Sequence, residues 1–450
     1  MREFDVVVMG AGPAGEVVAG RLAEHGQSVA LVEQFLVGGE CSYYACMPSK
    51  ALLRPVDLAN EVERVPGLEV GPIDVDAVFA RRDDVIHRLD DSAQLPWLEK
   101  RKVVLVRGRG RISGKLQVDV DGQEPLAARR AVVVATGSTP LVPDIPGLRE
   151  SQPWTNRNAT TASEVPPRFT ILGGGVVAAE MAQAWGALGS KVTVIHRGER
   201  LIKREEPFAS EQVLESLREI GVDVRFERTV THVARDGAFT ISLDDDSSVE
   251  ADQLLVAFGR VPGTNGIGLE TLGLEEGKPL LVGDDLRVRG HDWLFAIGDV
   301  NGRAQLTHMG KYQGRLVADT IIGRKVELRS DGGRSPRVIF TDPQVGAVGL
   351  TLAAAQEAGL NVRHVDVETS GNAGGSFVGR GARGTSRLVI DEDRRVVAGA
   401  TITGAEIAEA LHAATIAVVA EVSLDDLWHA VPSFPTRSEL WLKLLEAYGL

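Results

Sequence analysis

The chain has 450 residues, of which 44% are hydrophobic and 25% are charged, and its formal net charge is −13. This length allows about two to four domains. The acidic excess argues against nucleic acid or an anionic membrane as a partner, because both bind basic surfaces. The most apolar late stretch, Ala410 to Val422, is too short to span a bilayer, and no secretory signal precedes the first predicted strand. We therefore expect a cytoplasmic protein with acidic surfaces.

The first predicted elements form a nucleotide-binding fold. A strand from Glu3 to Met9 runs into a turn with glycines at Gly10, Gly12 and Gly15, a helix follows, and a second strand ends at Glu33. Such glycines allow a tight turn and close approach to a pyrophosphate, and the carboxylate can bind ribose hydroxyls. A carboxylate there repels a 2′-phosphate, so we predict that this site binds FAD.

The only two cysteines, Cys41 and Cys46, lie in the next segment, Gly38 to Lys50. In a regular helix they would be about 7.5 Å apart, beyond the roughly 7 Å limit for a disulfide, so bridging requires a distorted turn. Met47-Pro48 is suited to supply that distortion. Two unrelated buried thiols are an alternative, whereas a metal site lacks ligands and a structural disulfide is typical of secreted proteins. We interpret the pair as one redox unit.

Three short strands further along predict returns of the chain into a nucleotide fold. The strand from Ala131 to Ala135 leads into Thr136-Gly137-Ser138, and the strand from Leu254 to Ala257 leads into Phe258-Gly259-Arg260. The third, Trp293 to Ile297, ends in Gly298-Asp299. A carboxylate at a strand end, such as Asp299, can bind ribityl hydroxyls.

A second glycine turn lies between the first two of these strands. It follows a predicted strand from Arg168 to Leu172, and its small residues are Gly173, Gly175 and Ala178. The next strand ends at His196-Arg197, where the first fold has an acid. Basic residues tolerate or attract a 2′-phosphate, so we predict a preference for NADPH over NADH. The alternative is that Arg197 and the nearby basic residues are only a solvated face.

Taken in order, these motifs resemble the class I pyridine nucleotide-disulfide oxidoreductases, the family of glutathione reductase, dihydrolipoamide dehydrogenase and mercuric reductase. Pro48-Ser49-Lys50 and Phe340-Thr341-Asp342-Pro343 extend the resemblance over essentially the whole chain. It implies an α/β protein with two Rossmann-like domains, for FAD at 1–150 and for NAD(P) at 151–265. A return segment at 266–330 and a C-terminal α+β dimerisation domain at 331–450 would follow, with a mixed sheet and a helix from Glu406 to Ala420, in a homodimer.

The resemblance also implies residue roles. Cys46 would be the thiolate in contact with the flavin, and Cys41 the thiol that attacks the acceptor. Lys50 would lie beside the flavin and pair with Glu180, although an ordinary surface ion pair is the alternative. Electrons would pass from NADPH to FAD, then to the Cys41-Cys46 disulfide and on to an acceptor.

The chain departs from the family near its C-terminus. The family has a histidine before the proline that corresponds to Pro435, and here Phe434 stands in its place. Positioned proton transfer typically contributes about 10²- to 10⁴-fold, and phenylalanine cannot move a proton. Glu439 remains a candidate catalytic residue. Because it has no imidazole to orient, its alternative role is to hold the chain in place. His429 is either a substitute base or, as we favour, a residue at a helix end.

Other departures concern the acceptor. Tyr43 and Tyr44 are bulkier than the family's residues and either fill space or meet a flat acceptor. The C-terminal cysteine pair of mercuric reductase and the larger thioredoxin reductases is missing, which disfavours those activities. Three functions stay open. They are reduction of a disulfide or thiol-reactive acceptor through the cysteines, direct reduction of a quinone or similar small acceptor by FAD, and redox sensing through a binding partner.

Overall fold

The computed structural model covers residues 1–450, which divide into two compact units. Unit 1 consists of Met1–Pro48, Asp83–Pro140 and Arg260–Gly332. Unit 2 consists of Ser49–Arg82, Leu141–Gly259 and Gly333–Leu450. None of the helices combines the length and the apolar character that crossing a membrane requires. The boundaries expected at residues 150, 265 and 330 remain predictions.

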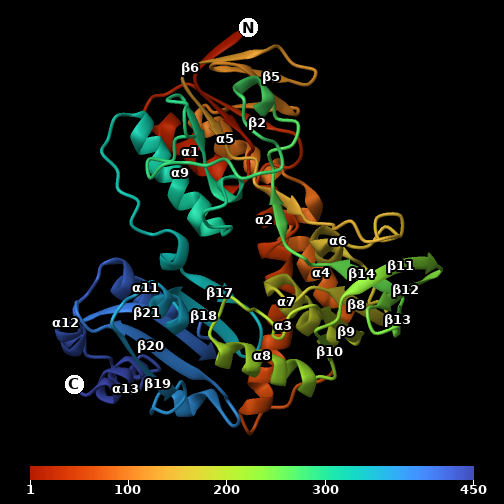
Figure 1. Ribbon diagram of the computed structural model, residues 1–450, viewed down its shortest axis with the longest axis vertical. Coiled ribbons are helices and arrows are strands. Elements are labelled where there is room, and N and C mark those ends of the chain that lie inside the picture. The colour runs from red at the N-terminus through yellow and green to blue at the C-terminus, as the bar shows by residue number, and fades with distance from the viewer. The chain divides into compact units, whose positions relative to one another are not determined.

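Unit 1 is built on a seven-stranded sheet in the order β3-β2-β1-β6-β5-β4, with β16 also paired to β6 (Figure 1). The strands β3, β2, β1, β6 and β16 are parallel, and β4 and β5 join them as an antiparallel hairpin. The bounds are β1 Arg2–Met9, β2 Val29–Glu33, β3 Val104–Arg107, β4 Gly110–Gly114, β5 Gln117–Val120, β6 Leu126–Val134 and β16 Leu294–Ala296. The alternation of parallel strands and crossover helices is that of a dinucleotide fold.

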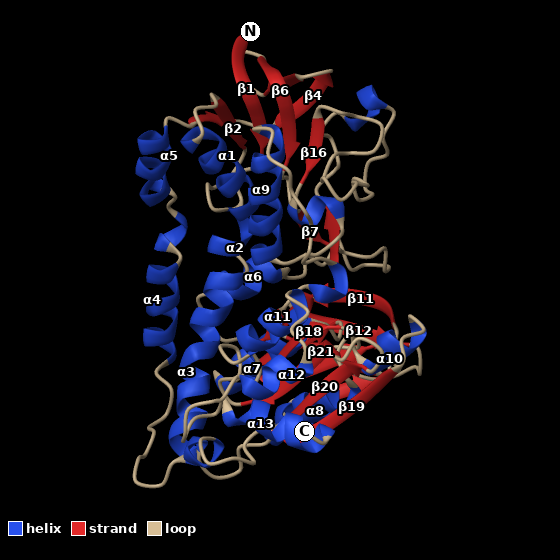
Figure 2. Cartoon of the chain, turned by 90° about the vertical axis from the view of Figure 1, so that its left-hand side faces the viewer, coloured by secondary structure: helices blue, strands red, loops and turns tan.

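Helices α1 (Pro13–Glu24) and α9 (Thr307–Ile321) pack side by side in unit 1, as both views show (Figures 1 and 2). Glycines on α9 allow this approach. A Cβ on Gly314 would lie 2.8 Å from the Ala14 carbonyl oxygen, and one on Gly310 would lie 3.2 Å from the Ala14 Cβ. Residues almost 300 positions apart in sequence are thereby brought together at the start of α1.

Unit 2 contains the second nucleotide fold, a four-stranded parallel sheet in the order β10-β9-β8-β14. Its strands are β8 Arg168–Leu172, β9 Lys191–His196, β10 Asp223–Phe226 and β14 Gln253–Val256, with helices α7 Val176–Ala187 and α8 Pro207–Glu219. A separate antiparallel sheet is formed by β11 Val230–Asp236, β12 Ala238–Leu243 and β13 Ser248–Ala251. The predicted strand from Arg168 to Leu172 is confirmed at both ends.

The C-terminal part of unit 2 is a five-stranded sheet, β17-β18-β21-β20-β19, with helices against it (Figure 2). All its pairs are antiparallel, so the expected mixed sheet is wrong. Antiparallel neighbours need only tight turns, as between β20 and β21. The strands are β17 Arg337–Ile339, β18 Gln344–Gly349, β19 Val362–Glu368, β20 Thr385–Asp391 and β21 Val396–Gly404.

The helices of this sheet correct a second expectation. The predicted helix from Glu406 is shorter, and α11 covers Leu411–Val419. Glu406 has φ of +50°, a left-handed conformation that a right-handed helix cannot include. The remaining helices of the chain are α2 Gly39–Tyr43, α3 Cys46–Arg64, α4 Val75–Val85, α5 Leu95–Arg101, α6 Asn156–Thr161, α10 Leu352–Glu357, α12 Leu424–His429 and α13 Glu439–Tyr448.

Candidate active site

The two cysteines lie on either side of a helix break in unit 1. Cys41 belongs to the short helix α2, Tyr44 leaves helical geometry with φ of −134°, and Cys46 is the first residue of α3. The distortion that a disulfide requires therefore lies at Tyr44, four residues before Pro48, and the part that Met47-Pro48 plays in it stays a prediction. Pro48 lies in the first turn of α3, where its missing N–H leaves no helical bond unmade.

Both cysteines are free thiols and they interact with each other. The hydrogen bond with Cys46 is the largest cause of a raised pKa at Cys41, and burial and the charge of Cys46 act in the same direction. Cys41 therefore keeps the proton when the pair carries one negative charge. The charge then lies on Cys46 at the N-terminus of α3, where a helix stabilises an anion.

Helix α9 supplies two further groups to this pair. The Thr307 Oγ1 lies 3.4 Å from the Cys46 Sγ. A hydrogen bond from Thr307 and the charge of Lys311 both lower the pKa of Cys41, against the larger effects of Cys46 and burial. Sequence reasoning missed both residues, because no local pattern connects α9 with the cysteine segment.

Tyr43 and Tyr44 also follow Cys41 closely. The Tyr43 side chain is buried and its hydroxyl has no hydrogen-bond partner, while burial raises the pKa of this phenol to about 12. The two rings have centroids 6.4 Å apart. Tyr43 thus fills buried space and stays protonated at neutral pH, which favours the structural alternative for this residue.

The first glycine turn has one open position. A Cβ on Gly10 would lie 2.4 Å from the Ala135 carbonyl oxygen, and one on Gly15 would lie 1.9 Å from the Gly10 carbonyl oxygen, so both glycines are required by packing. Gly12, the N-cap of α1, has only the Gly39 Cα at 4.0 Å. The free amides of a helix N-terminus and an open backbone at Gly12 fit a pyrophosphate.

Glu33 is held by the backbone of the same turn. Its carboxylate oxygens accept hydrogen bonds from the amides of Ala11 and Phe35, each at 2.7 Å. Burial is the largest effect on this group and raises the pKa of Glu33. Each oxygen keeps a lone pair for a ribose hydroxyl, as the predicted role requires.

The Thr136 to Ser138 segment and Asp299 meet in a polar network in unit 1. The Ser138 hydroxyl donates to Asp299 at 2.5 Å, and Arg260 donates to the Ser138 hydroxyl at 2.6 Å and to Glu40 at 2.9 Å. Burial raises the pKa of Asp299, although its side chain remains 26% exposed. Sequence reasoning missed Glu40, which directly precedes Cys41.

These groups fit the flavin nucleotide that the sequence predicts. The Thr136 hydroxyl is buried without a partner, which an additional polar group can satisfy. Gly137 and Gly298 have φ of +69° and +75°, conformations that glycine adopts without strain. Together with the open Gly12 and the free lone pairs of Glu33, they form a cradle for phosphate and hydroxyl groups.

The second glycine turn repeats the arrangement in unit 2. A Cβ on Gly173 would lie 2.3 Å from the Ala257 carbonyl oxygen, whereas Gly175 has no atom within 4 Å. Ala178 is fully buried, as a small residue in this position should be. Gly259, in the loop after β14, has φ of +124°. The open N-cap glycine, Gly175, again leaves room for a phosphate.

His196 and Arg197 differ in what they can do. The His196 ring lies against Gly174, where a Cβ would be 2.5 Å from it. Burial is the largest of the effects that lower the pKa of His196, so the ring is neutral at pH 7. Arg197 is exposed. Of the predicted basic pair, Arg197 therefore carries the charge that a 2′-phosphate would meet.

Lys50 and Glu180 form an ion pair in unit 2. The Lys50 Nζ lies 2.7 Å from a Glu180 carboxylate oxygen, and the other oxygen accepts the Phe340 amide at 3.0 Å. The Phe340 ring lies 4.6 Å from the Lys50 Nζ. Glu180 is only 5% exposed, so the pair is not an ordinary surface contact.

The C-terminal segment of unit 2 has no comparable set of contacts. Phe434 is 76% exposed, and His429 is the exposed last residue of α12. Glu439 begins α13 and accepts the Gly374 amide at 3.3 Å. The contacts of Glu439 are those of a residue that holds the chain, and those of His429 are those of a helix end.

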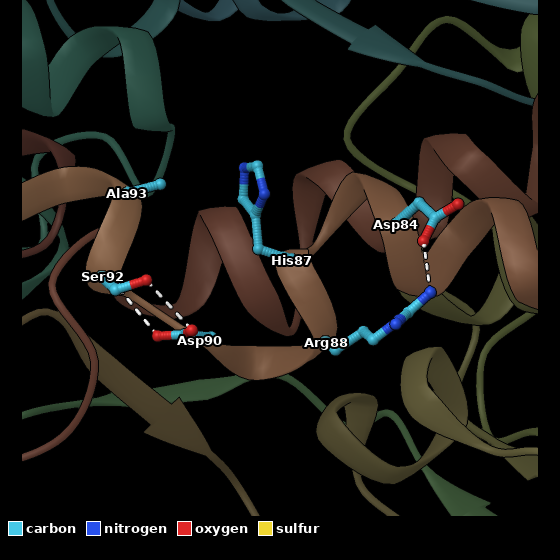
Figure 3. A pocket seen from close by; sticks show the side chains of 6 residues that line it. All are labelled: Asp84, His87, Arg88, Asp90, Ser92 and Ala93. Carbon is cyan, nitrogen blue, oxygen red and sulfur yellow. Dashed lines mark hydrogen bonds and ion pairs between the residues drawn. The ribbon is translucent and has the colours of Figure 1, made fainter.

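One open hollow of about 370 Å³ lies in unit 1 and contains none of the predicted site residues (Figure 3). Its side chains interact with one another: the Arg88 guanidinium donates to Asp84 at 3.0 Å, and the Ser92 hydroxyl donates to Asp90 at 3.0 Å. No group of three His, Cys, Asp or Glu side chains in the chain is arranged to hold a metal ion. We assign the hollow no part in the chemistry.

Comparisons with known proteins now identify the family. Residues 4–314 match the model of the pyridine nucleotide-disulphide oxidoreductases, and residues 335–444 match the dimerisation domain of the same family. The chain belongs to this family. Its members are FAD-dependent enzymes that use NAD(P)H as electron donor, so the predicted family, fold class, enzyme class and FAD cofactor are confirmed.

Relatives of this protein align with nearly the whole length of the chain. It is 31% identical to a mercuric reductase of Staphylococcus aureus over 97% of this chain and 81% of that protein. It is 30% identical to a glutathione reductase of Burkholderia cepacia over 98% of both. The fold is similar to that of the HOCl-induced flavoprotein disulfide reductase RclA from Escherichia coli, in the structure of its copper(II) complex. The TM-score is 0.88 and the identity is 24%, over 99% of both chains.

Proposed function

We propose that this enzyme uses NADPH to reduce, through FAD and the Cys41-Cys46 dithiol, a small disulfide or another thiol-reactive acceptor. The observation that carries the proposal is the paired thiol arrangement, in which Cys41 is hydrogen-bonded to Cys46, the first residue of α3, and the Cys46 Sγ lies 3.4 Å from the Thr307 Oγ1. The family's dimerisation domain supports a homodimer, and the low cysteine content, two in 450 residues, suits a cytoplasmic location.

The residues proposed to hold FAD are those of the cradle in unit 1. Gly10, Gly12 and Gly15 would admit the pyrophosphate, Glu33 the ribose, and Thr136, Gly137, Ser138, Arg260, Gly298 and Asp299 the rest of the molecule. When bound, FAD supplies transfer of an electron pair between the nicotinamide and the dithiol. The protein's own part is to keep Cys46 ionised and Cys41 available for attack.

Substitution of Cys41 by serine tests this route. In Cys41→Ser, reduction of an aromatic disulfide such as 5,5′-dithiobis(2-nitrobenzoate) should fall by about 10³-fold or more, because the attacking thiol is lost. Flavin content, measured by absorbance, is the control for folding. Undiminished reduction of this disulfide would contradict the proposal.

Direct reduction of a quinone by FAD is the second candidate. Phe434, exposed where the family has its histidine, favours it, because a quinone needs no proton from that position. The same Cys41→Ser protein distinguishes the two functions. If menadione is the physiological type of acceptor, its reduction should remain at the wild-type rate while disulfide reduction is lost.

We further propose NADPH as the preferred donor. Arg197 is exposed beside the second glycine turn, and Lys203 is exposed in the loop that follows. In Arg197→Glu, kcat/KM for NADPH should fall by about 100-fold relative to NADH, since a charge-assisted contact is replaced by repulsion. Lys191→Glu, at the opposite end of β9, is the matched control. An NADH preference in the wild-type enzyme would contradict the proposal.

A further inference from the structure

The loop between β9 and α8 ends in four charged residues, Lys203 to Glu206, that differ in burial. Lys203 and Arg204 are exposed. Glu205 and Glu206 are buried, with 6% and 2% of their surface exposed. Two basic side chains are therefore presented to solvent next to two carboxylates that lie inside unit 2.

Both carboxylates have partners in the C-terminal sheet of the same unit. One Glu206 oxygen accepts the Leu352 amide at 2.7 Å, and the other accepts the Arg387 Nη1 of β20 at 3.0 Å. A Glu205 oxygen accepts the Arg337 Nε of β17 at 2.7 Å. Buried carboxylates need such partners, because an ionised group without one is costly to bury. The end of the loop is thus bound to two strands of the five-stranded sheet.

Arg387 is fixed in place by further contacts. Its Nε and Nη2 each donate to Asp366 of β19 at 2.7 Å, which leaves Nη1 for Glu206. The guanidinium also lies 5.1 Å from the ring centre of Phe208, in the first turn of α8. The Arg387 side chain is only 14% exposed, so solvent screens its pair with Glu206 little.

On the other side of the basic residues, the loop is bound to the second glycine turn. The Ile202 amide donates to the Gly174 carbonyl at 2.7 Å, and Ile202 itself is buried. Gly174 directly precedes Gly175, the open position of the turn. Only Lys203 and Arg204 lie between Ile202 and the two buried carboxylates.

These contacts leave the two basic residues little freedom. They are fixed on one side by the glycine turn and on the other by the carboxylates, so their position relative to Gly175 depends on what holds the carboxylates. The holding residues, Arg337, Leu352 and Arg387, all lie within 335–444, the stretch that matches the family's dimerisation domain. A part of the chain outside the nucleotide fold therefore takes part in placing the loop.

A second link between α8 and the same sheet serves as a comparison. Arg383, two residues before β20, lies 2.8 Å from Glu219 and 3.4 Å from Glu215. More than half of each of these three side chains is exposed, and exposed ion pairs contribute little. Loss of this link should leave Lys203 and Arg204 in place.

We propose that Glu206 and Arg387 are positioning residues for the electron donor, and that their ion pair holds Lys203 and Arg204 where a 2′-phosphate meets them. The inference rests on the proposed function, because it requires NADPH as the donor. Glu206 and Arg387 are buried and act through the basic residues, not by contact with the donor. The preference for NADPH then depends on the C-terminal sheet as well as on the nucleotide fold.

The test compares donors that differ only in the 2′-phosphate. In the Arg387→Met holoenzyme, KM for NADPH should rise by about tenfold, while KM for NADH and kcat with either donor should change by less than about threefold. Competitive inhibition gives a second readout. The affinity for adenosine 2′,5′-bisphosphate should fall by a similar factor, and that for adenosine 5′-monophosphate should not change. A merely structural role would weaken both donors and both inhibitors alike.

Two more variants of the pair and a matched control complete the series. Glu206→Gln keeps an acceptor for the Leu352 amide but loses the charge, so it should resemble Arg387→Met. Arg387→Lys keeps the charge without the three donors in use, so it should recover part of the affinity for NADPH. Arg383→Met, which removes only the exposed link, should match the wild type. Flavin absorbance controls for folding in each protein.

The outcomes separate this inference from the proposed donor. If Arg387→Met and Glu206→Gln keep the wild-type preference for NADPH, or lose affinity for both donors equally, the inference is overturned and the proposed donor stands. A preference of the wild-type enzyme for NADH would instead refute the proposed donor, and this inference with it.

Discussion

The cysteine segment and the C-terminal segment Val431 to Glu439 form the two halves of the active site that the resemblance implies, and they differ in how they are built. In the first, the Cys41 thiol is hydrogen-bonded to Cys46, and the Thr307 Oγ1 lies 3.4 Å from the Cys46 Sγ. In the second, Phe434 is 76% exposed and Glu439 makes one 3.3 Å contact with a backbone amide. The cysteine segment is therefore held by side-chain contacts, whereas the C-terminal segment is exposed, so one can change while the other is kept.

After the loss of Cys41, the largest effect should come from substitution of Lys50, which follows Cys46 on α3. Lys50→Met leaves the carboxylate of Glu180, 5% exposed, with only the Phe340 amide. We expect a loss of about 2 kcal/mol in the free energy of unfolding, reduced from a fully buried pair because Lys50 is partly exposed. Urea denaturation measures it.

Glu180→Gln is the matched variant for this pair. Its amide keeps an acceptor for the Phe340 N–H, and the partly exposed Lys50 can be solvated, so the loss should be smaller than in Lys50→Met. A larger loss in Glu180→Gln would show that the carboxylate has more partners than the ion pair provides.

The smallest effect should come from restoring the missing imidazole. In Phe434→His, reduction of glutathione disulfide or lipoamide should change by less than about threefold, because position 434 is 76% exposed and Glu439, which would orient an imidazole, already accepts the Gly374 amide. Steady-state rates with 2-hydroxyethyl disulfide are the companion measurement. A gain of tenfold or more would mean that the C-terminal segment still limits the reaction, and the contrast between the two halves would be lost.

The nucleotide folds were predictable from sequence because their signals are local. A strand, a glycine turn, a helix and a second strand follow one another within about 30 residues, and the second strand ends on Glu33 in one fold and on His196 in the other. Packing sets the role of each glycine, and the same pattern of two tight positions and one open position recurs at Gly12 and Gly175.

The surroundings of the dithiol could not be predicted in this way. Thr307 and Lys311 reach it because Gly310 and Gly314 let α9 approach α1, and neither glycine stands in a recognisable motif. Glu16 directly follows Gly15 of the glycine turn, yet the pKa of its carboxyl is raised by burial and by Glu33, against the charge of Lys311, and neither neighbour is close to it in sequence. The position of the helix break at Tyr44 and the left-handed Glu406 are backbone features that hydrophobic pattern does not encode.

The most direct test of the account is anaerobic stopped-flow absorbance during reduction of the enzyme by NADPH. If electrons pass to Cys41 and Cys46, one equivalent of NADPH should leave the flavin oxidised and produce the long-wavelength band of a thiolate beside it. Cys46→Ser, with its flavin retained, should lack that band. Bleaching of the wild-type flavin by one equivalent, with no such band, would contradict the claim that the dithiol accepts the electrons.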